Sequence, residues 1–202
     1  MTHYLSSAEA DGVEITCKPT FDLPHEIQSK LIPFSFQRFG SDSKWLSAPS
    51  VDRLLSNDNL WCIAHQDGHI RASLFVDRQL SDAGMNCTIK SLMSDGSIGG
   101  IGKILVSIAA TETLRSTSLP VSLLAFLRVL NGEHNVPSMM AFNKAGFFSI
   151  VPPARVPIEQ HDIHLAADEE TQDGCFDVQR LDGQPKQILE QATWLLRHWR
   201  PA

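Results

Sequence analysis

The sequence lacks several features that would assign it to a membrane, a nucleic acid or a secretory pathway. No apolar run approaches the roughly 20 residues that a membrane-spanning helix needs. Lysine and arginine form no long run and the formal net charge is −6, which argues against a general polyanion-binding surface. Residues 1–9 lack the basic and apolar segments of a signal peptide. We therefore expect a cytoplasmic protein with no nucleic-acid or membrane partner.

Metal and disulfide signals are also weak. The 4 cysteines are far apart and form no CxxC pair, so neither a zinc site nor a disulfide framework is predicted. His161 and His164 are close in sequence, but on a strand their side chains would face opposite sides. We predict no metal site.

The residues that are present indicate one domain of mixed secondary structure. A chain of 202 residues, 43% of them hydrophobic, is long enough for one hydrophobic core and too short for two domains of typical size. Apolar alternation and turn signals predict strands at 13–17, 60–65, 69–76, 86–93, 121–130, 147–151, 162–166 and 175–181. Helical spacing and caps predict helices at 24–34, 51–55, 101–116 and 185–199, and a short one between Asn135 and Gly146.

Some of these segments carry more specific expectations. Asp67-Gly68 between two apolar runs predicts a hairpin turn, and 77–84 is expected to be a loop. Pro33 is expected to end or kink the first helix. The aromatic residues Phe34, Phe36, Phe39 and Trp45 fit either ordinary core and lid packing or the wall of a substrate pocket.

The glycine-rich stretch between the predicted strand 86–93 and the helix 101–116 is the main candidate site. Gly99, Gly100 and Gly102 have no Cβ, so an anion can approach the backbone closely. The first amides of the following helix are unpaired and carry the positive end of its dipole. Together these features make a phosphate cradle; the alternative is a flexible turn without a ligand.

Two motifs in this order resemble the GNAT superfamily of acyl-CoA-dependent N-acyltransferases. The segment 97–102, Ser-Ile-Gly-Gly-Ile-Gly, is similar to the family's (Gln/Arg)-x-x-Gly-x-(Gly/Ala) diphosphate loop. Asn135, Ser138, Phe142, Gly146 and Phe147 are similar to its Asn-x-x-(Ala/Ser)-x-x-x-Tyr-x-x-x-Gly-Phe helix. The resemblance implies an α+β fold, with a central mixed, mostly antiparallel sheet, helices on both faces and a C-terminal helical extension.

The resemblance covers about residues 13–167. It implies a GNAT-like domain at 1–167, followed at 168–202 by an acidic linker, a strand and a helix that pack on the same domain or on a partner subunit. A homodimer is one possible assembly. The helix bearing Trp194 and Trp199 is either a partner surface or packed on its own core.

The resemblance also implies a site for acetyl-CoA or another acyl-CoA. The strand backbone would pair with the pantetheine amides, the loop amides would hold the diphosphate, Asn135 would bond the pantetheine arm, and Phe142 would lie beside the thioester sulfur. The implied cofactor-binding residues are Leu92, Met93, Ser94, Ser97, Ile98, Gly99, Gly100, Ile101, Gly102, Lys103, Asn135, Ser138 and Phe142.

Two departures from the family pattern bear on the chemistry. Ser97 replaces the long loop side chain, for which Lys103 either compensates or remains a solvated helix residue. Phe142 replaces the tyrosine that usually donates a proton. His134 and Glu133 are the nearest titratable groups in sequence, and histidine titrates in the required range. They are predicted catalytic residues; the alternative is that they are polar loop residues.

The implied activity is transfer of an acetyl or other short acyl group from coenzyme A to an amine, by direct attack on the thioester. The acceptor would be a small-molecule amine, a peptide N-terminus or a lysine. Two alternatives stay open because of Phe142: a protein of this fold that uses a carrier-protein-bound acyl thioester, and a non-catalytic acyl-CoA-binding module.

Overall fold

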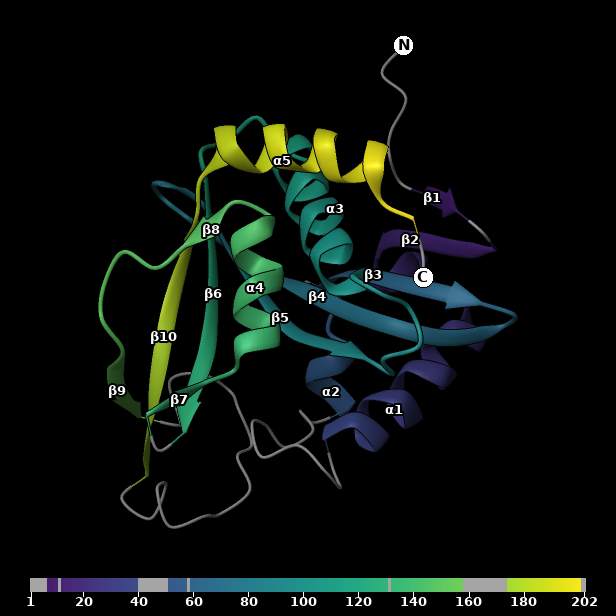
Figure 1. The fold of residues 1–202 in the computed structure, drawn as a ribbon, viewed down its shortest axis with the longest axis horizontal. Coiled ribbons are helices and arrows are strands. Elements are labelled where there is room, and N and C mark those ends of the chain that lie inside the picture. Colours follow the sequence, from purple (N-terminus) through teal and green to yellow (C-terminus); the bar gives the residue numbers. More distant parts are fainter. Residues whose placement is uncertain are drawn as a thin grey trace.

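The computed structural model describes residues 7–10, 12–39, 51–57, 59–130, 132–157 and 174–200. One 10-stranded sheet runs through it in the order β1-β2-β3-β4-β5-β6-β10-β8, with β7 paired to β6 and β9 paired to β10 (Figure 1). Its strands are β1 (Ser7–Ala10), β2 (Val13–Pro19), β3 (Asn59–Gln66), β4 (His69–Ser81), β5 (Gly84–Ser94), β6 (Val121–Leu130), β7 (Glu133–His134), β8 (Phe147–Phe148), β9 (Ala154–Pro157) and β10 (Cys175–Gly183). All pairs are antiparallel except β5 with β6.

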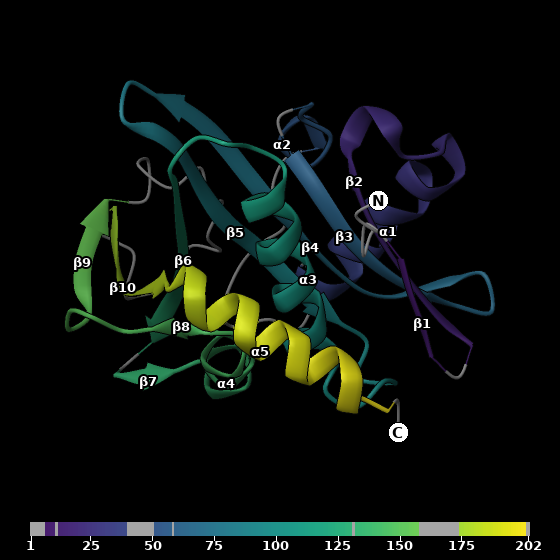
Figure 2. The same cartoon turned by 90° about the horizontal axis from the view of Figure 1, so that it is seen from above.

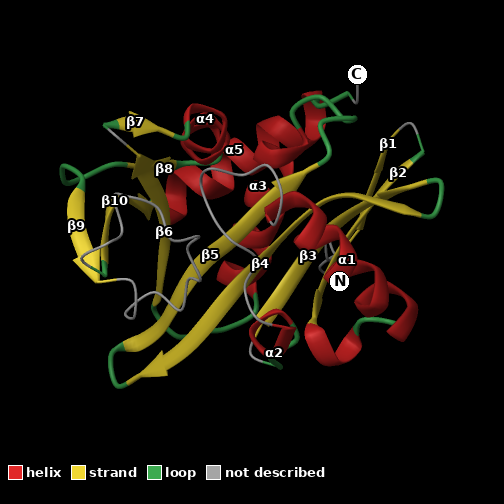
Figure 3. Cartoon of the chain, turned by 90° about the horizontal axis from the view of Figure 1, so that it is seen from below, coloured by secondary structure: helices red, strands yellow, loops and turns green. Residues whose placement is uncertain are grey.

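Helices cover both faces of the sheet, as Figures 2 and 3 show from above and below. The helices are η1 (Thr20–Asp22), α1 (His25–Phe39), α2 (Val51–Leu54), α3 (Ile101–Arg115), α4 (Val136–Lys144) and α5 (Pro185–His198). This is the mixed, mostly antiparallel α+β architecture that the sequence predicts. None of the helices in the described ranges is long and apolar enough to cross a membrane.

Strand alternation divides the core into two clusters. On β3, Cys62 and Ala64 face α3, α4 and α5, whereas Trp61 and Ile63 face α1 and α2. The Trp61 and Phe75 rings pack with centroids 5.1 Å apart in the second cluster. Because a pleated strand sends neighbouring side chains to opposite faces, one apolar strand serves both layers.

Most predicted elements are confirmed, and the 69–76 strand is longer than expected. The expected loop at 77–84 is wrong, because β4 continues to Ser81 and β5 begins at Gly84. Arg78, Gln79 and Leu80 pair with 85–87 across a tight hairpin. This extension is exposed at its end and polar, so its strand character comes from backbone pairing rather than from apolar alternation.

The first helix also differs from its predicted form. Pro33 lies inside α1, which continues to Phe39, so the proline does not end the helix. An internal proline removes one backbone hydrogen bond and its ring crowds the preceding turn, but Leu31 and Phe34 of α1 are buried in the second cluster. Phe34 is therefore a core residue; the Phe36 and Phe39 side chains and Trp45 lie outside the described part of the chain.

The C-terminal segment enters the sheet itself. β10 pairs with β6 on one side and with β8 and β9 on the other, and α5 then packs against α3. The predicted strand at 162–166 lies outside the described residues, as do His161 and His164.

Candidate functional site

The site begins where β5 and β6 part. These parallel strands pair only from Met85 with Val121 to Ile89 with Ala125. Beyond Ile89 the β5 backbone carries a bulge: the register against β4 shifts between Ser73 and Phe75, and Ser91 adopts a left-handed φ of 54°. A bulge bends the strand and disrupts the ladder, so the end of β5 leaves β6 and its backbone edge there has no β6 partner.

The chain then turns into α3 through the predicted glycine stretch. Gly100 caps α3 with φ 70° and ψ 11°, and Ile101 N–H donates to the Ile98 carbonyl at 3.4 Å. These are the features of a type II turn, whose third residue favours glycine. No side chain from the described part of the chain caps the helix, and its first turn holds no acidic residue. The amides at this helix start therefore keep their affinity for an anion.

Asp95 organises the loop that precedes the turn. Its carboxylate accepts hydrogen bonds from the Ser97 backbone N–H at 2.9 Å and from the Ser97 hydroxyl, and it forms an ion pair with Arg71 at 3.3 Å. Burial acts to raise the pKa of Asp95, but these bonds from Ser97 and Arg71 outweigh it and lower that pKa. The carboxylate stays ionised and holds the loop in place through these bonds from Ser97.

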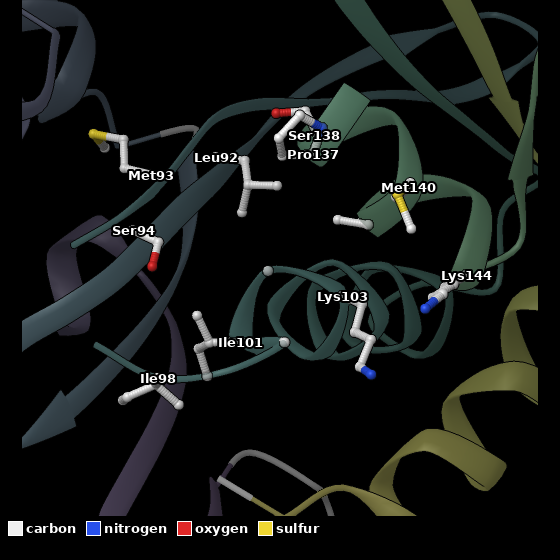
Figure 4. A pocket seen from close by; sticks show the side chains of 13 residues that line it. Leu92, Met93, Ser94, Ile98, Ile101, Lys103, Pro137, Ser138, Met140 and Lys144 are labelled. Atoms are coloured by element: carbon white, nitrogen blue, oxygen red, sulfur yellow. The ribbon is translucent and has the colours of Figure 1, made fainter. Parts of the chain in front are cut away.

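A groove of about 440 Å³ runs along these elements. Its floor is the free end of β5, one wall is the turn and the start of α3, and the other wall is α4 (Figure 4). The lining residues are Leu92, Met93, Ser94, Ile98, Gly100, Ile101, Gly102, Lys103, Pro137, Ser138, Met140, Ala141 and Lys144. The groove is mostly apolar with a few polar groups, and its size is typical of a small-molecule site.

Two cations line one side of this groove. Lys103 lies in the first turn of α3 and Lys144 at the end of α4. The Lys103 side chain folds back over the turn, since a Cβ added to Gly100 would lie 3.0 Å from its Cε and 3.2 Å from its Nζ. Its ammonium therefore adds charge next to the open amides of the turn.

The structure brings most of the predicted cofactor-binding residues together. Leu92, Met93 and Ser94, most of the loop and Ser138 line the groove. Ser97, Gly99, Asn135 and Phe142 do not belong to the lining. Asn135 instead caps α4, its Oδ1 accepting from the Ser138 N–H at 3.2 Å.

Phe142 faces the core. Its side chain is 2% exposed and packs edge-on against Phe147, with ring centroids 5.4 Å apart. A ring without a hydroxyl gains most from apolar packing of this kind.

His134 and Glu133 lie together on β7, which pairs with the end of β6. Glu133 is exposed, and neither residue lines the groove. His134 is half-buried, and its Nδ1 finds no hydrogen-bond partner among the described residues. It directly precedes Asn135, the cap of the helix that forms the groove wall.

The sequence reasoning missed Pro137, Met140, Ala141 and Lys144. The sequence could have predicted them, because Met140 and Ala141 each lie three or four residues from Pro137 and from Lys144, and residues at that spacing share one face of a helix. The described residues contain no cluster of three or more metal-ligating side chains.

No protein-family model matches this sequence, and no curated protein matches it significantly. Solved structures match it over most of its length. An acyl-CoA N-acyltransferase from Pseudomonas aeruginosa is 19% identical, with 85% of this chain and 99% of that chain covered and a TM-score of 0.55. An acetyltransferase of the GNAT family from Streptococcus pneumoniae is 13% identical, with 83% and 97% covered and a TM-score of 0.58.

The chain has the GNAT fold. Spermidine N-acetyltransferase from Vibrio cholerae, solved in complex with CoA and spermine, is also similar, at 11% identity, 87% and 98% coverage and a TM-score of 0.56. The matches cover 97% and 98% of these two neighbours, and β10 belongs to the sheet of this chain.

Proposed function

We propose that this protein binds an acyl-CoA in the β5–α3–α4 groove and transfers its acyl group, an acetyl or another short chain, to an amine acceptor. The observation that carries the proposal is the groove itself. It joins a free strand edge, suited to the amides of a pantetheine arm, to uncapped helix amides and two lysines, suited to a diphosphate. The Vibrio cholerae neighbour binds CoA and spermine, so the GNAT fold accommodates such a pair of ligands.

An acyl-CoA supplies an activated thioester, and attack by a neutral amine yields an amide and the CoA thiol. In this chain the Ser91 bulge frees the backbone of Leu92 and Met93 to hydrogen-bond the donor and orient it. Holding both reactants at a fixed geometry supplies much of the rate gain in reactions of this type. Backbone amides near the bulge are the candidate donors to the developing oxyanion.

Proton transfer has two candidate carriers. The acceptor ammonium must lose a proton before attack, and the departing thiolate must gain one. His134 is our preferred carrier because its Nδ1 is unpartnered among the described residues, and Glu133 is the neighbouring carboxylate. The His134→Gln variant keeps a polar side chain of similar reach, and we expect it to lower kcat. An unchanged kcat would contradict this role.

A non-catalytic acyl-CoA-binding module is the second candidate function. Phe142 cannot donate a proton, and among the described residues that line the groove the only titratable side chains are lysines. Use of an acyl carrier protein instead of CoA is the third possibility that the sequence leaves open.

Calorimetry and a thiol-release assay separate these functions. We expect purified protein to bind acetyl-CoA or a larger acyl-CoA with micromolar affinity, and to release CoA thiol in the presence of a panel of small amines and peptides. Binding without release under the whole panel would favour the binding module. Turnover only with carrier-bound thioesters would favour the carrier protein, and absence of binding to any acyl-CoA would contradict the proposal.

A further inference from the structure

A side chain directly after the C-terminal helix α5 contacts the glycine turn. Trp199 follows α5 directly, is 7% exposed and belongs to the main core cluster. Its indole Nε1–H donates a hydrogen bond to the Gly99 carbonyl at 3.2 Å. This bond joins residues 100 positions apart in sequence, and Gly99 stands in the turn that borders the groove.

The contact falls on the peptide unit that defines the turn. A type II turn differs from a type I turn mainly by a flip of its central peptide, here the Gly99–Gly100 unit. With two adjacent glycines, both orientations are sterically open to the chain. A hydrogen bond to the Gly99 carbonyl therefore selects one of them.

The selected orientation has a consequence for the groove. A trans peptide is planar, and its C=O and N–H point in opposite directions. When Trp199 holds the Gly99 carbonyl on the α5 side, the Gly100 N–H points to the other side of the turn. Gly100 lines the groove, and no described residue accepts a hydrogen bond from its N–H.

We propose that Trp199 is a positioning residue for the diphosphate-binding turn: its indole fixes the Gly99–Gly100 peptide so that the Gly100 N–H faces the ligand. This inference rests on the proposed binding of CoA in the groove. It couples two regions, because a ligand that orders the turn also strengthens the docking of α5, and the coupling is reciprocal.

The test compares Trp199→Phe with Trp194→Phe. Phenylalanine keeps an aromatic ring in the core but removes the N–H donor. Trp194 lies on α5, five residues before Trp199, is 58% exposed and stacks only on His198 among the described rings, so it is a matched control. Circular dichroism and thermal melts establish that both variants are folded before binding is measured.

Calorimetry with CoA and with acetyl-pantetheine, which lacks the diphosphate, gives the decisive readout. We expect Trp199→Phe to weaken CoA binding about three- to tenfold, the range for one lost hydrogen bond, while acetyl-pantetheine binding and kcat at saturating donor stay unchanged. Trp194→Phe should match the wild type with both ligands. Equal CoA binding by Trp199→Phe, or equal weakening with both ligands, would overturn the inference.

A second measurement needs no variant. In wild-type protein, saturating CoA should slow hydrogen exchange of the Trp199 indole proton and leave that of Trp194 unchanged. An unaffected Trp199 proton in a CoA-saturated sample would overturn the inference while the proposed function stands. Failure of wild-type protein to bind CoA would overturn both.

Discussion

Lys90 and Asp77 form an ion pair with a 2.8 Å Nζ–Oδ2 distance on the face of the sheet opposite α3. Lys90 is the first β5 residue beyond the last β6 pair, so the ion pair stands where the two strands part. The Asp77 side chain is only 4% exposed and that of Lys90 is 23% exposed. Removing one partner of a charge buried this deeply is costly.

Removing one partner should therefore destabilise the protein. We expect Lys90→Met to lower the free energy of unfolding by about 1–3 kcal/mol, less than for a fully buried pair because Lys90 is partly solvated. Urea denaturation measures this change in the free energy of unfolding. Lys30→Met, which removes the exposed Glu26–Lys30 pair and the Lys30 hydrogen bond to the Gly68 carbonyl, should cost less. Equal costs for the two variants would show that the Lys90–Asp77 pair has no special role.

Gly146 should be intolerant of any side chain. Its φ is 93°, and an added Cβ would lie 2.8 Å from the Ile188 backbone nitrogen. We expect Gly146→Ala to cost more than about 2 kcal/mol, because a clash with backbone adds to the usual cost of a left-handed alanine. Gly68→Ala is the control, since Gly68 has φ 74° and no atom within 4 Å of an added Cβ. A similar melting temperature for both variants would mean that the α5 backbone beside Gly146 shifts at little cost.

Glu112 should limit stability at neutral pH. Burial raises the pKa of its carboxyl above the ordinary 4.5, more than Arg115 lowers it. A raised folded pKa gives stability that is complete below the unfolded pKa and lost as pH rises through the folded pKa. Glu112→Gln does not titrate, so we expect it to be more stable than wild type near pH 7 and equal to it below pH 4.5. Denaturation curves across this range measure the difference.

The opposite sign is expected for an exposed carboxylate. Lys30 lowers the pKa of Glu26 through a hydrogen bond and its charge, so Glu26→Gln should be less stable than wild type near pH 7, and this deficit should disappear as pH falls through the lowered pKa. A Glu112→Gln advantage that is constant with pH would contradict the assigned cause.

Lys103 and Lys144 should contribute to donor affinity through charge. We expect Lys103→Met and Lys144→Met each to weaken CoA binding about fivefold, equivalent to roughly 1 kcal/mol for a partly exposed ion pair. The loss should shrink at high salt, because screening weakens exposed pairs. Lys186→Met is the control, since Lys186 is exposed on α5 and outside the groove. Calorimetry of CoA binding at two ionic strengths measures the effect of both variants. An equal loss of affinity for Lys186→Met would show that net charge, and not the position of these lysines, sets the affinity.

The sequence by itself determined the elements whose signals are local. Asn135 caps α4, Asp67 and Gly68 turn the β3–β4 hairpin, and Gly100 starts α3. In each case a side chain or a missing Cβ acts on backbone groups a few residues away, so short-range chemistry is sufficient.

Only the tertiary structure decided how these elements meet. It buries Phe142 against Phe147, brings Lys144 to the groove, inserts β10 beside β6, and joins Trp199 to Gly99. These contacts link residues far apart in sequence, and they depend on strand pairing and packing of the whole domain. A residue pattern reports which side chains are apolar or charged, but many partners are compatible with that pattern until the sheet order and helix packing are fixed.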